Sequence, residues 1–267
     1  MSSMKPWTTT RIRACKGEQR IACLTAYDYA TARLIDAAGI QVALVGDSLG
    51  MTVLGYETTL PVTMEEMLHH TAAVARGVEQ ALVVADMPFM SYQVSCEQAL
   101  TNAGRFLKEA GADAVKIEGG RRRVDTVCAL VDNGIPVLGH VGLTPQSVRQ
   151  LGGYKVQGKQ PEAARELIED ACALADAGLF ALVLECVPKE LAAEITKRIA
   201  IPTIGIGAGA ACDGQVLVTH DLLGMYSDLS PKFVKRYAEL GPIMQEAFMA
   251  YREEVESGAF PAPEHSF

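Results

Sequence analysis

Hydrophobic residues along the chain gather in short continuous runs of Val, Leu, Ile and Ala. Such runs are typical of strands that are buried on both faces, as in parallel sheets. The runs predict eight strands, at residues 21–26, 42–47, 82–86, 114–118, 136–140, 180–185, 202–207 and 215–219.

Amphipathic segments separate these runs. They predict helices at residues 29–38, 63–76, 96–110, 122–133, 161–177 and 189–199, and residues 231–257 predict one or two closing helices. Several helical segments end on a glycine that is followed directly by an apolar run, as at Gly39 and Gly111. A glycine just past a helix is the expected left-handed helix stop. Residues 257–267 predict an irregular end.

Strands that alternate with helices in this way favour an α/β fold, a (β/α)8 TIM barrel. A doubly wound open sheet is the alternative, but it rarely uses eight parallel strands at this length. No linker or low-complexity stretch divides the chain, so we expect a single barrel domain over 1–267, with a short N-terminal extension and a C-terminal helical tail. Residues 205–210 (GIGAGA) resemble a dinucleotide-binding loop, but no obvious helix follows them.

Composition narrows the function classes. The formal net charge of −8 argues against an electrostatic nucleic-acid binder. No stretch approaches the roughly 20 apolar residues that cross a bilayer, and the N-terminus has no apolar core of a secretory signal. The seven cysteines are scattered singly without a CxxC pair, which indicates reduced thiols and predicts a cytoplasmic protein.

Four of the apolar runs end on an acidic residue. These residues are Asp47, Asp86, Glu118 and Glu185. In a barrel, the carboxyl ends of the strands converge on one spot. Carboxylates that lie close together repel one another unless a cation or a shared proton balances them. The pattern therefore points to chemistry at this end of the barrel.

A lysine accompanies one of these acids. Lys116 and Glu118 are two residues apart on a strand, so their side chains point to the same face. A structural salt bridge is one interpretation. Two ionisable groups are costly to bury without further partners, however, and Asp47 and Asp86 are the nearest candidates. We therefore favour a functional cluster.

The ligand types indicate the metal. Carboxylate oxygens without nearby Cys or clustered His select Mg²⁺ over zinc. A partly hydrated Mg²⁺ can bind two oxygens of a 2-oxo acid and stabilise the enolate that forms when a neighbouring carbon loses its proton. Lys116 would then hold the carboxylate or the oxo group of the substrate.

Other residues near the strand ends allow two interpretations each. Glu185, on the sixth strand, suits a general base that faces the substrate; a solvated rim carboxylate is the alternative. His140 is either a hydrogen-bond partner of the substrate or a satisfied core histidine. Residues 152–159 form either a lid with glycine hinges or a surface loop. For Cys186 we prefer a buried apolar role to that of a nucleophile.

Many segments together resemble the ketopantoate hydroxymethyltransferase family. They are VGDSLGM (45–51), LPVTMEEMLHHTAAV (60–74), ADMPFMSY (85–92), VKIEGG (115–120), GHVGLTPQSV (139–148), GGYKVQGK (152–159), LVLECVP (182–188) and IPTIGIGAG (201–209). The resemblance extends from about residue 20 to the C-terminal tail. It implies a barrel of the phosphoenolpyruvate/pyruvate superfamily and a homo-oligomer, a decamer.

The resemblance also implies a reaction. The family transfers a hydroxymethyl group from 5,10-methylenetetrahydrofolate to 3-methyl-2-oxobutanoate and forms 2-dehydropantoate, in the synthesis of pantothenate and coenzyme A. By the same resemblance, Mg²⁺ falls on Asp47, Asp86 and Glu118, the substrate contacts on Asp47, Ser48, Asp86 and Lys116, and the proton acceptor on Glu185.

Two other functions stay open. One is another Mg²⁺-dependent enzyme of the same superfamily that forms enolates of 2-oxo acids, such as an isocitrate lyase-like or phosphonopyruvate-type enzyme. Many of those lyases carry a K-K-C-G-H loop, which this chain lacks. The other is a non-catalytic binder of 2-oxo acids. It would retain Asp47, Asp86 and Lys116 but would need no base such as Glu185.

Overall fold

A computed structural model describes residues 6–225 and 231–267 of the chain. The chain forms two compact units that divide after Leu217. Of the described residues, those that form strands all belong to the first unit, and the second contains the C-terminal helices. The expectation that 1–267 form one domain stays a prediction.

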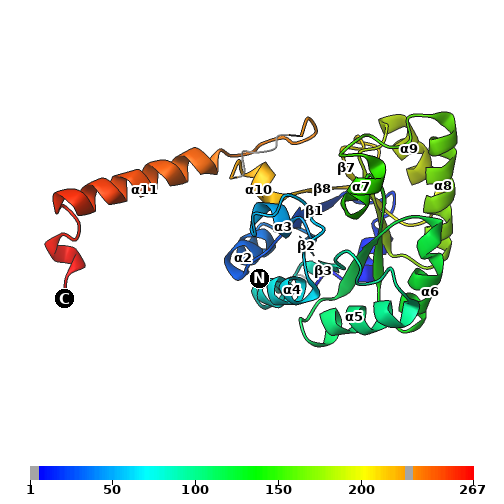
Figure 1. Cartoon of the computed structure of the whole chain (residues 1–267), viewed down its shortest axis with the longest axis horizontal. Helices are drawn as coiled ribbons and strands as arrows, with labels where there is room; N and C mark the ends of the chain where they lie inside the picture. Colours follow the sequence, from blue (N-terminus) through cyan, green and yellow to red (C-terminus); the bar gives the residue numbers. More distant parts are fainter. Residues whose placement is uncertain (1–5, 226–230) are drawn as a thin grey trace. The chain divides into compact units, whose positions relative to one another are not determined.

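Eight parallel strands close into a barrel in the first unit (Figure 1). They are β1 (Ile21–Thr25), β2 (Val42–Val45), β3 (Leu82–Asp86), β4 (Ala114–Glu118), β5 (Val137–Gly142), β6 (Ala181–Glu185), β7 (Thr203–Ile206) and β8 (Gly214–Leu217). Each strand pairs with the next, and β8 pairs with β1. The predicted (β/α)8 barrel is confirmed, and the open-sheet alternative is wrong.

The helices between the strands also match their predicted segments. They are α2 (Tyr29–Ala37), α4 (Met64–Gly77), α5 (Cys96–Lys108), α6 (Val124–Asp132), α8 (Pro161–Asp176) and α9 (Lys189–Arg198). Gly39 and Gly111, just past α2 and α5, have φ angles of 76° and 74°, as a left-handed stop requires. The sequence did not predict the short helices α1 (Thr9–Ala14), α3 (Leu49–Thr52), α7 (Val148–Leu151) and α10 (Thr219–Leu222).

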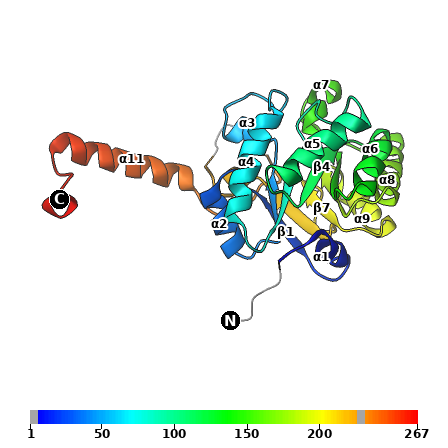
Figure 2. The same ribbon diagram turned by 90° about the horizontal axis from the view of Figure 1, so that it is seen from below.

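Successive side chains of each strand point alternately into the barrel and towards the helices, so the buried residues form an inner and an outer cluster. The inner cluster contains the first inward-facing residues of the strands, among them Ile21, Val42, Leu82, Ala114, Leu138, Ala181, Ile204 and Val216. Ile12 of α1 is fully buried in the same cluster. Helix α1 therefore closes the N-terminal end of the barrel. Figure 2 shows it at the opposite end from α3 and α7.

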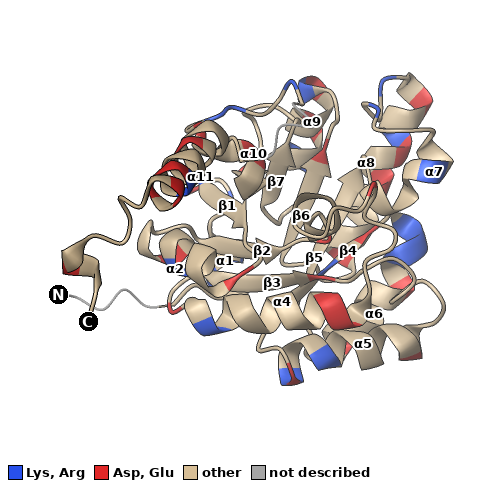
Figure 3. Ribbon diagram, turned by 60° about the vertical axis from the view of Figure 1, so that its left-hand side comes forward, with Lys and Arg blue, Asp and Glu red and all other residues tan. Residues whose placement is uncertain are grey.

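The outward faces of the same strands pack against the helices. Val83, Val115 and Leu182 belong to the outer cluster, together with Phe106 of α5 and Leu174 of α8. Most charged residues lie on the surrounding helices, and only a few interrupt the strands (Figure 3). Charged residues on the strands are therefore exceptions to the packing of the barrel.

The second unit contains α10, α11 (Leu240–Ser257) and a short 3-10 turn at Pro263–His265. The helix predicted within 231–257 is confirmed only over α11, and the end predicted to be irregular includes the 3-10 turn. Apolar side chains of α11 such as Ile243 and Phe248 are exposed. Among the described residues, no helix has the length and apolarity to cross a membrane.

Candidate active site

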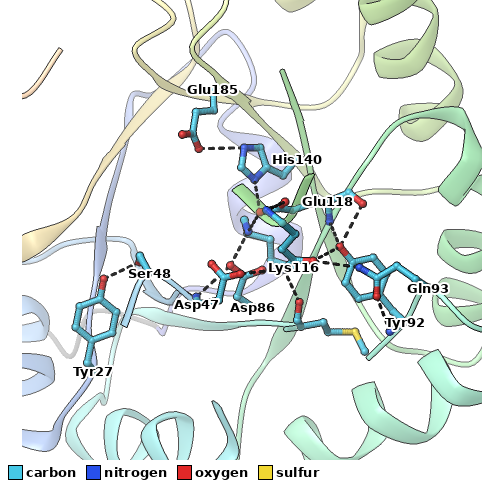
Figure 4. A network of polar contacts seen from close by, with 12 residues as sticks. Tyr27, Asp47, Ser48, Asp86, Tyr92, Gln93, Lys116, Glu118, His140 and Glu185 are labelled. Atoms are coloured by element: carbon cyan, nitrogen blue, oxygen red, sulfur yellow. Dashed lines mark hydrogen bonds and ion pairs between the residues drawn. The ribbon is translucent and has the colours of Figure 1, made fainter. Parts of the chain in front are cut away.

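The strand faces that begin apolar inside the barrel end in polar residues. Asp86 is the last residue of β3, Lys116 and Glu118 are the third and fifth of β4, His140 is the fourth of β5, and Glu185 is the last of β6. Because every second side chain of a strand points to the same face, these polar residues lie on the same inward faces as the apolar residues that precede them. The structure thus brings the predicted polar residues together at the C-terminal end of the barrel (Figure 4).

Three carboxylates form a compact group. Asp47, Asp86 and Glu118 are buried, and one oxygen of each lies within 4.8 Å of the others. Among the described residues, Oδ1 of Asp86 and Oε1 of Glu118 have no hydrogen-bond partner. Buried polar atoms normally have one. An oxygen-only site in which Asp86 Oδ1 has no hydrogen bond and Glu118 Oε1 has only ion-pair contacts of 3.4 Å and 3.5 Å fits a hard cation such as Mg²⁺.

Lys116 lies beside this group. Its Nζ is 2.6 Å from Asp86 Oδ2 and 3.5 Å from Glu118 Oε1, which confirms that Lys116 and Glu118 share a face. Burial alone would lower the pKa of Lys116, but the three carboxylates, led by Asp86, raise it above its usual value. The ammonium therefore stays charged at neutral pH.

The three carboxylates do not titrate alike. Burial raises the pKa of Asp47 well above its ordinary value, and the charges of Asp86 and Glu118 raise it further. Burial also raises the pKa of Asp86, against the effect of Lys116. For Glu118, Lys116 and His140 outweigh burial, so its pKa is lowered. Of the three carboxyls, burial and like charges therefore disfavour the ionised form of Asp47 and Asp86, whereas Lys116 and His140 favour that of Glu118.

His140 links the cluster to Glu185. Its Nδ1 is 3.4 Å from Glu118 Oε1 and its Nε2 is 3.2 Å from Glu185 Oε2. Burial and Lys116 would lower the pKa of His140, but contacts with Glu118 and Glu185 raise it to about 9. The Glu185 side chain is 15% exposed, whereas that of Glu118 is 2% exposed. Glu185 thus lies outside the three-carboxylate group and is the more accessible acid.

Asp47 and Ser48 lie in a turn rather than on a strand. Strand β2 ends at Val45, two residues earlier than its predicted end, and Ser48 has the helical angles φ −54° and ψ −18°. The Asp47 backbone N–H donates to Asp86 Oδ2 at 3.3 Å. The Ser48 hydroxyl is 2.8 Å from the Tyr27 hydroxyl. This turn folds Asp47 towards β3.

Sequence reasoning missed two residues that contact the cluster. Gln146 donates through Nε2 to Asp47 Oδ2 at 3.0 Å, and the Tyr92 hydroxyl donates to Gln146 Oε1 at 2.7 Å. Both side chains are buried. Gln146 lies in a 3-10 turn after β5 and Tyr92 in the loop after β3. Neither position follows an apolar run, so no periodicity marks it.

Three smaller expectations have different outcomes. Cys186 is half-buried, and not fully buried as preferred from the sequence; burial and, to a lesser extent, Glu185 raise the pKa of its thiol to about 12, which makes it a poor nucleophile at neutral pH. No helix follows residues 205–210 before β8, so the dinucleotide interpretation is correctly rejected. In the loop 152–159, the Gln157 backbone N–H donates to the Cys186 carbonyl at 2.8 Å. Whether this loop acts as a lid stays a prediction.

Sequence comparisons agree on one family. A family model described as ketopantoate hydroxymethyltransferase matches residues 6–263. A 3-methyl-2-oxobutanoate hydroxymethyltransferase of Clostridium novyi is 59% identical over 264 residues, which cover 99% of this chain and 96% of the relative. An enzyme of the same name from Carboxydothermus hydrogenoformans is 64% identical, covering 93% of this chain and 90% of the relative.

Solved structures with the same barrel are more distant in sequence. A phosphoenolpyruvate phosphomutase from Streptomyces platensis subsp. rosaceus has a TM-score of 0.61 at 18% identity, covering 96% of this chain and 92% of that chain. A 2,3-dimethylmalate lyase, described as a member of the PEP mutase/isocitrate lyase superfamily, has a TM-score of 0.61 at 17% identity, covering 96% and 92%. At these identities the likeness concerns the fold alone.

Proposed function

Because the chain belongs to the ketopantoate hydroxymethyltransferase family, we propose that it transfers a hydroxymethyl group from 5,10-methylenetetrahydrofolate to 3-methyl-2-oxobutanoate. The product is 2-dehydropantoate, which leads to pantothenate and coenzyme A. Relatives that carry the name of this activity match the chain over nearly its whole length.

The observation that carries the proposal is the buried group of Asp47, Asp86 and Glu118 beside Lys116. The donor set fits Mg²⁺, because two buried oxygens have no hydrogen-bond partner among the described residues. When bound, the cation would polarise the oxo group of the substrate and offset the negative charge of the enolate. We assign the three carboxylates as its ligands, directly or through water.

Lys116, Asp47 and Ser48 would orient the oxo acid. The Lys116 ammonium is charged and lies beside Asp86 and Glu118, so it suits the substrate's carboxylate or oxo oxygen. The Ser48 hydroxyl, in the turn after β2, is held by the Tyr27 hydroxyl at 2.8 Å. A substrate held on both sides presents its branched carbon in one orientation, which lowers the entropic part of the barrier.

Glu185 would act as the general base. It is the accessible acid of the site, and His140 holds one of its oxygens. With a pKa raised to about 9, His140 is protonated at neutral pH and forms ion pairs with Glu118 at 3.4 Å and Glu185 at 3.2 Å. We propose that His140 orients Glu185 towards the branched carbon and contacts the substrate.

The transfer exchanges one C–H bond of the oxo acid and two C–N bonds of the folate for a C–C bond and a C–O bond. Glu185 takes the proton of the branched carbon, and the enolate carbon forms a bond to the methylene carbon of the folate. Both bonds between this carbon and the folate nitrogens break, and water supplies the hydroxyl oxygen. The two nitrogens take up the proton from the branched carbon and one proton of the water.

We also propose a homo-oligomer, a decamer as the family resemblance implies, and a cytoplasmic location. The exposed apolar side chains of α11 support self-association. All seven cysteines are free, which suits a reducing compartment.

Hydrogen–deuterium exchange at the branched carbon of 3-methyl-2-oxobutanoate tests the mechanism. We expect exchange in D2O that depends on Mg²⁺ and falls by about 10²-fold or more in Glu185→Gln. No exchange with Mg²⁺ and tetrahydrofolate present would contradict the enolate mechanism. Undiminished exchange in the variant would remove Glu185 from the role of base. Turnover without any folate or formaldehyde source would instead indicate a lyase.

A further inference from the structure

Gln146 is 4% exposed, and every polar atom of its side chain has a partner. Its Nε2 donates to Asp47 Oδ2 at 3.0 Å and to the Met87 carbonyl at 2.9 Å. Its Oε1 accepts from the Tyr92 hydroxyl at 2.7 Å and from Gln93 Nε2 at 3.2 Å. A side-chain amide offers two N–H donors and two acceptor lone pairs. The amide of Gln146 uses all of them.

The partners leave one orientation for this amide. The Met87 carbonyl can only accept a hydrogen bond, so the NH2 group faces it. On the other side, the Glu118 backbone N–H donates to the Tyr92 hydroxyl at 3.0 Å. The Tyr92 hydrogen is therefore available for its shortest contact, Gln146 Oε1. With the amide fixed in this way, Asp47 Oδ2 must act as an acceptor.

The backbone of the same residue holds a second carboxylate. The Gln146 N–H donates to Glu118 Oε2 at 3.1 Å. One residue thus binds one oxygen of Asp47 and one of Glu118, which come from different strand ends. Asp86, the third acid, is held through its Oδ2 by Lys116. Two oxygens, Asp86 Oδ1 and Glu118 Oε1, have no hydrogen-bond partner among the described residues.

We propose that Gln146 is a positioning residue, which sets the separation of Asp47 and Glu118 for a divalent cation. This inference depends on the cation site of the proposed function. Gln146 touches neither substrate nor metal in this role; it acts through the two carboxylates. Residues that orient metal ligands typically change metal affinity by about 10–100-fold when they are replaced.

A purely structural role would have other consequences. Gln146 also satisfies buried polar groups, so its loss would destabilise the fold in any case. A substitution that changes the charge of Gln146 distinguishes a positioning role from a purely structural one. Gln146→Glu adds a negative group beside the site, and simple electrostatics would then increase cation affinity. A positioning role requires the opposite, because a carboxylate oxygen would face two acceptors, Asp47 Oδ2 and the Met87 carbonyl.

The test measures Mn²⁺ and Mg²⁺ binding to the full chain, by calorimetry and by the Mn²⁺ electron paramagnetic resonance spectrum, with and without 3-methyl-2-oxobutanoate. We expect Gln146→Met and Gln146→Glu to weaken binding by about tenfold or more and to alter the Mn²⁺ line shape. Tyr92→Phe keeps the ring and removes the hydroxyl, and it should weaken binding less. Tyr92→Phe also decides the question if the Gln146 variants do not fold.

Thr203→Val is the matched control. Thr203 is buried at the other end of the barrel, where its hydroxyl is 2.7 Å from that of Thr196. The control should lower the unfolding temperature but leave the cation affinity unchanged. An equal loss of affinity in Thr203→Val would attribute the effect to general destabilisation and overturn the assignment of Gln146.

Two further outcomes distinguish this inference from the proposed function. If the wild-type chain binds Mn²⁺ but the Gln146 variants bind it equally well or more tightly, Gln146 has no positioning role and the cation site stands. If the wild-type chain binds neither cation, with or without the oxo acid, the cation site itself fails and the role of Gln146 fails with it.

Discussion

Each end of the barrel pairs a lysine with an aspartate, half-buried Lys16 with Asp213 at one end and buried Lys116 with Asp86 at the other, and the two ends differ in how completely the carboxylates are satisfied. At the N-terminal end, Asp213 Oδ2 accepts from Lys16 Nζ at 2.9 Å and from the Thr203 N–H at 2.8 Å. Its Oδ1 accepts from the Gly17 N–H at 3.2 Å. Both oxygens are therefore bound by the chain itself.

At the C-terminal end, one oxygen of Asp86 and one of Glu118 lack a hydrogen bond among the described residues. The pKa shifts follow this difference. Around Asp213, the Thr203 N–H and Lys16 outweigh burial and lower the pKa, whereas burial raises the pKa of Asp86 even beside Lys116. Burying a charged pair is offset only where the remaining atoms of the pair are also satisfied, as both oxygens of Asp213 are. The other end retains binding capacity for a ligand.

Replacing the lysine at each end should show the largest difference between the two ends. Lys116→Met leaves Asp86 and Glu118 without their cationic partner, so we expect the kcat/KM for 3-methyl-2-oxobutanoate to fall by about 10²–10³-fold. Lys16→Met should leave kcat/KM within about twofold and lower the free energy of unfolding by about 1–2 kcal/mol. Steady-state kinetics and urea unfolding measure the two effects. Equal losses of activity in both variants would contradict the division between the ends.

Adding a cation should stabilise the protein through one end alone. A ligand at 100 times its Kd stabilises the folded state by about 2.7 kcal/mol. We expect Mg²⁺ to raise the unfolding temperature of the wild-type chain accordingly, and to have little effect on Asp86→Asn. Asp213→Asn, the control at the other end, should start from a lower temperature and show the full increase. A cation effect that survives in Asp86→Asn would locate the binding elsewhere.

Lowering the pH should reduce the contribution of Asp213, at the N-terminal end, to the stability of the fold. The pKa of Asp213 is lower in the folded chain, so its contribution to stability is present above the unfolded pKa of about 3.9 and is lost as pH falls through the folded value. Asp213→Asn should therefore be about 1–2 kcal/mol less stable at neutral pH and lose less stability on acidification. Unfolding by urea at pH 7 and at lower pH values measures both. Parallel pH profiles for wild type and variant would contradict the assignment.

The strands and the acids at their ends were predictable because both depend on local order in the sequence. The run at 114–118 needs no knowledge of the fold to place Lys116 and Glu118 on one face. Gln146 and Tyr92 could not be found in this way, because their roles arise where loops from different strands meet. The end of β2 was misplaced for a similar reason. The chain turns after Val45, so that Asp47 reaches Asp86.

Helix α1 was missed because its apolar contribution is small. Its one buried residue, Ile12, gives no periodic signal, and only the inner cluster of the barrel shows what it covers. The glycine stops, by contrast, were correct at Gly39 and Gly111, since the requirement for a positive φ is local. Prediction from sequence therefore works within one element and fails where distant elements meet.

The inward strand faces, apolar at first and polar at the end, have an evolutionary consequence. Packing of the barrel depends on residues such as Val42 and Leu82, whereas the polar residues of the candidate site lie later along the strands, as Asp86 does, or just past them, as Asp47 does. Mutations at those later positions can accumulate without repacking the layers below. The same barrel scaffold can therefore carry different polar residues at its C-terminal end.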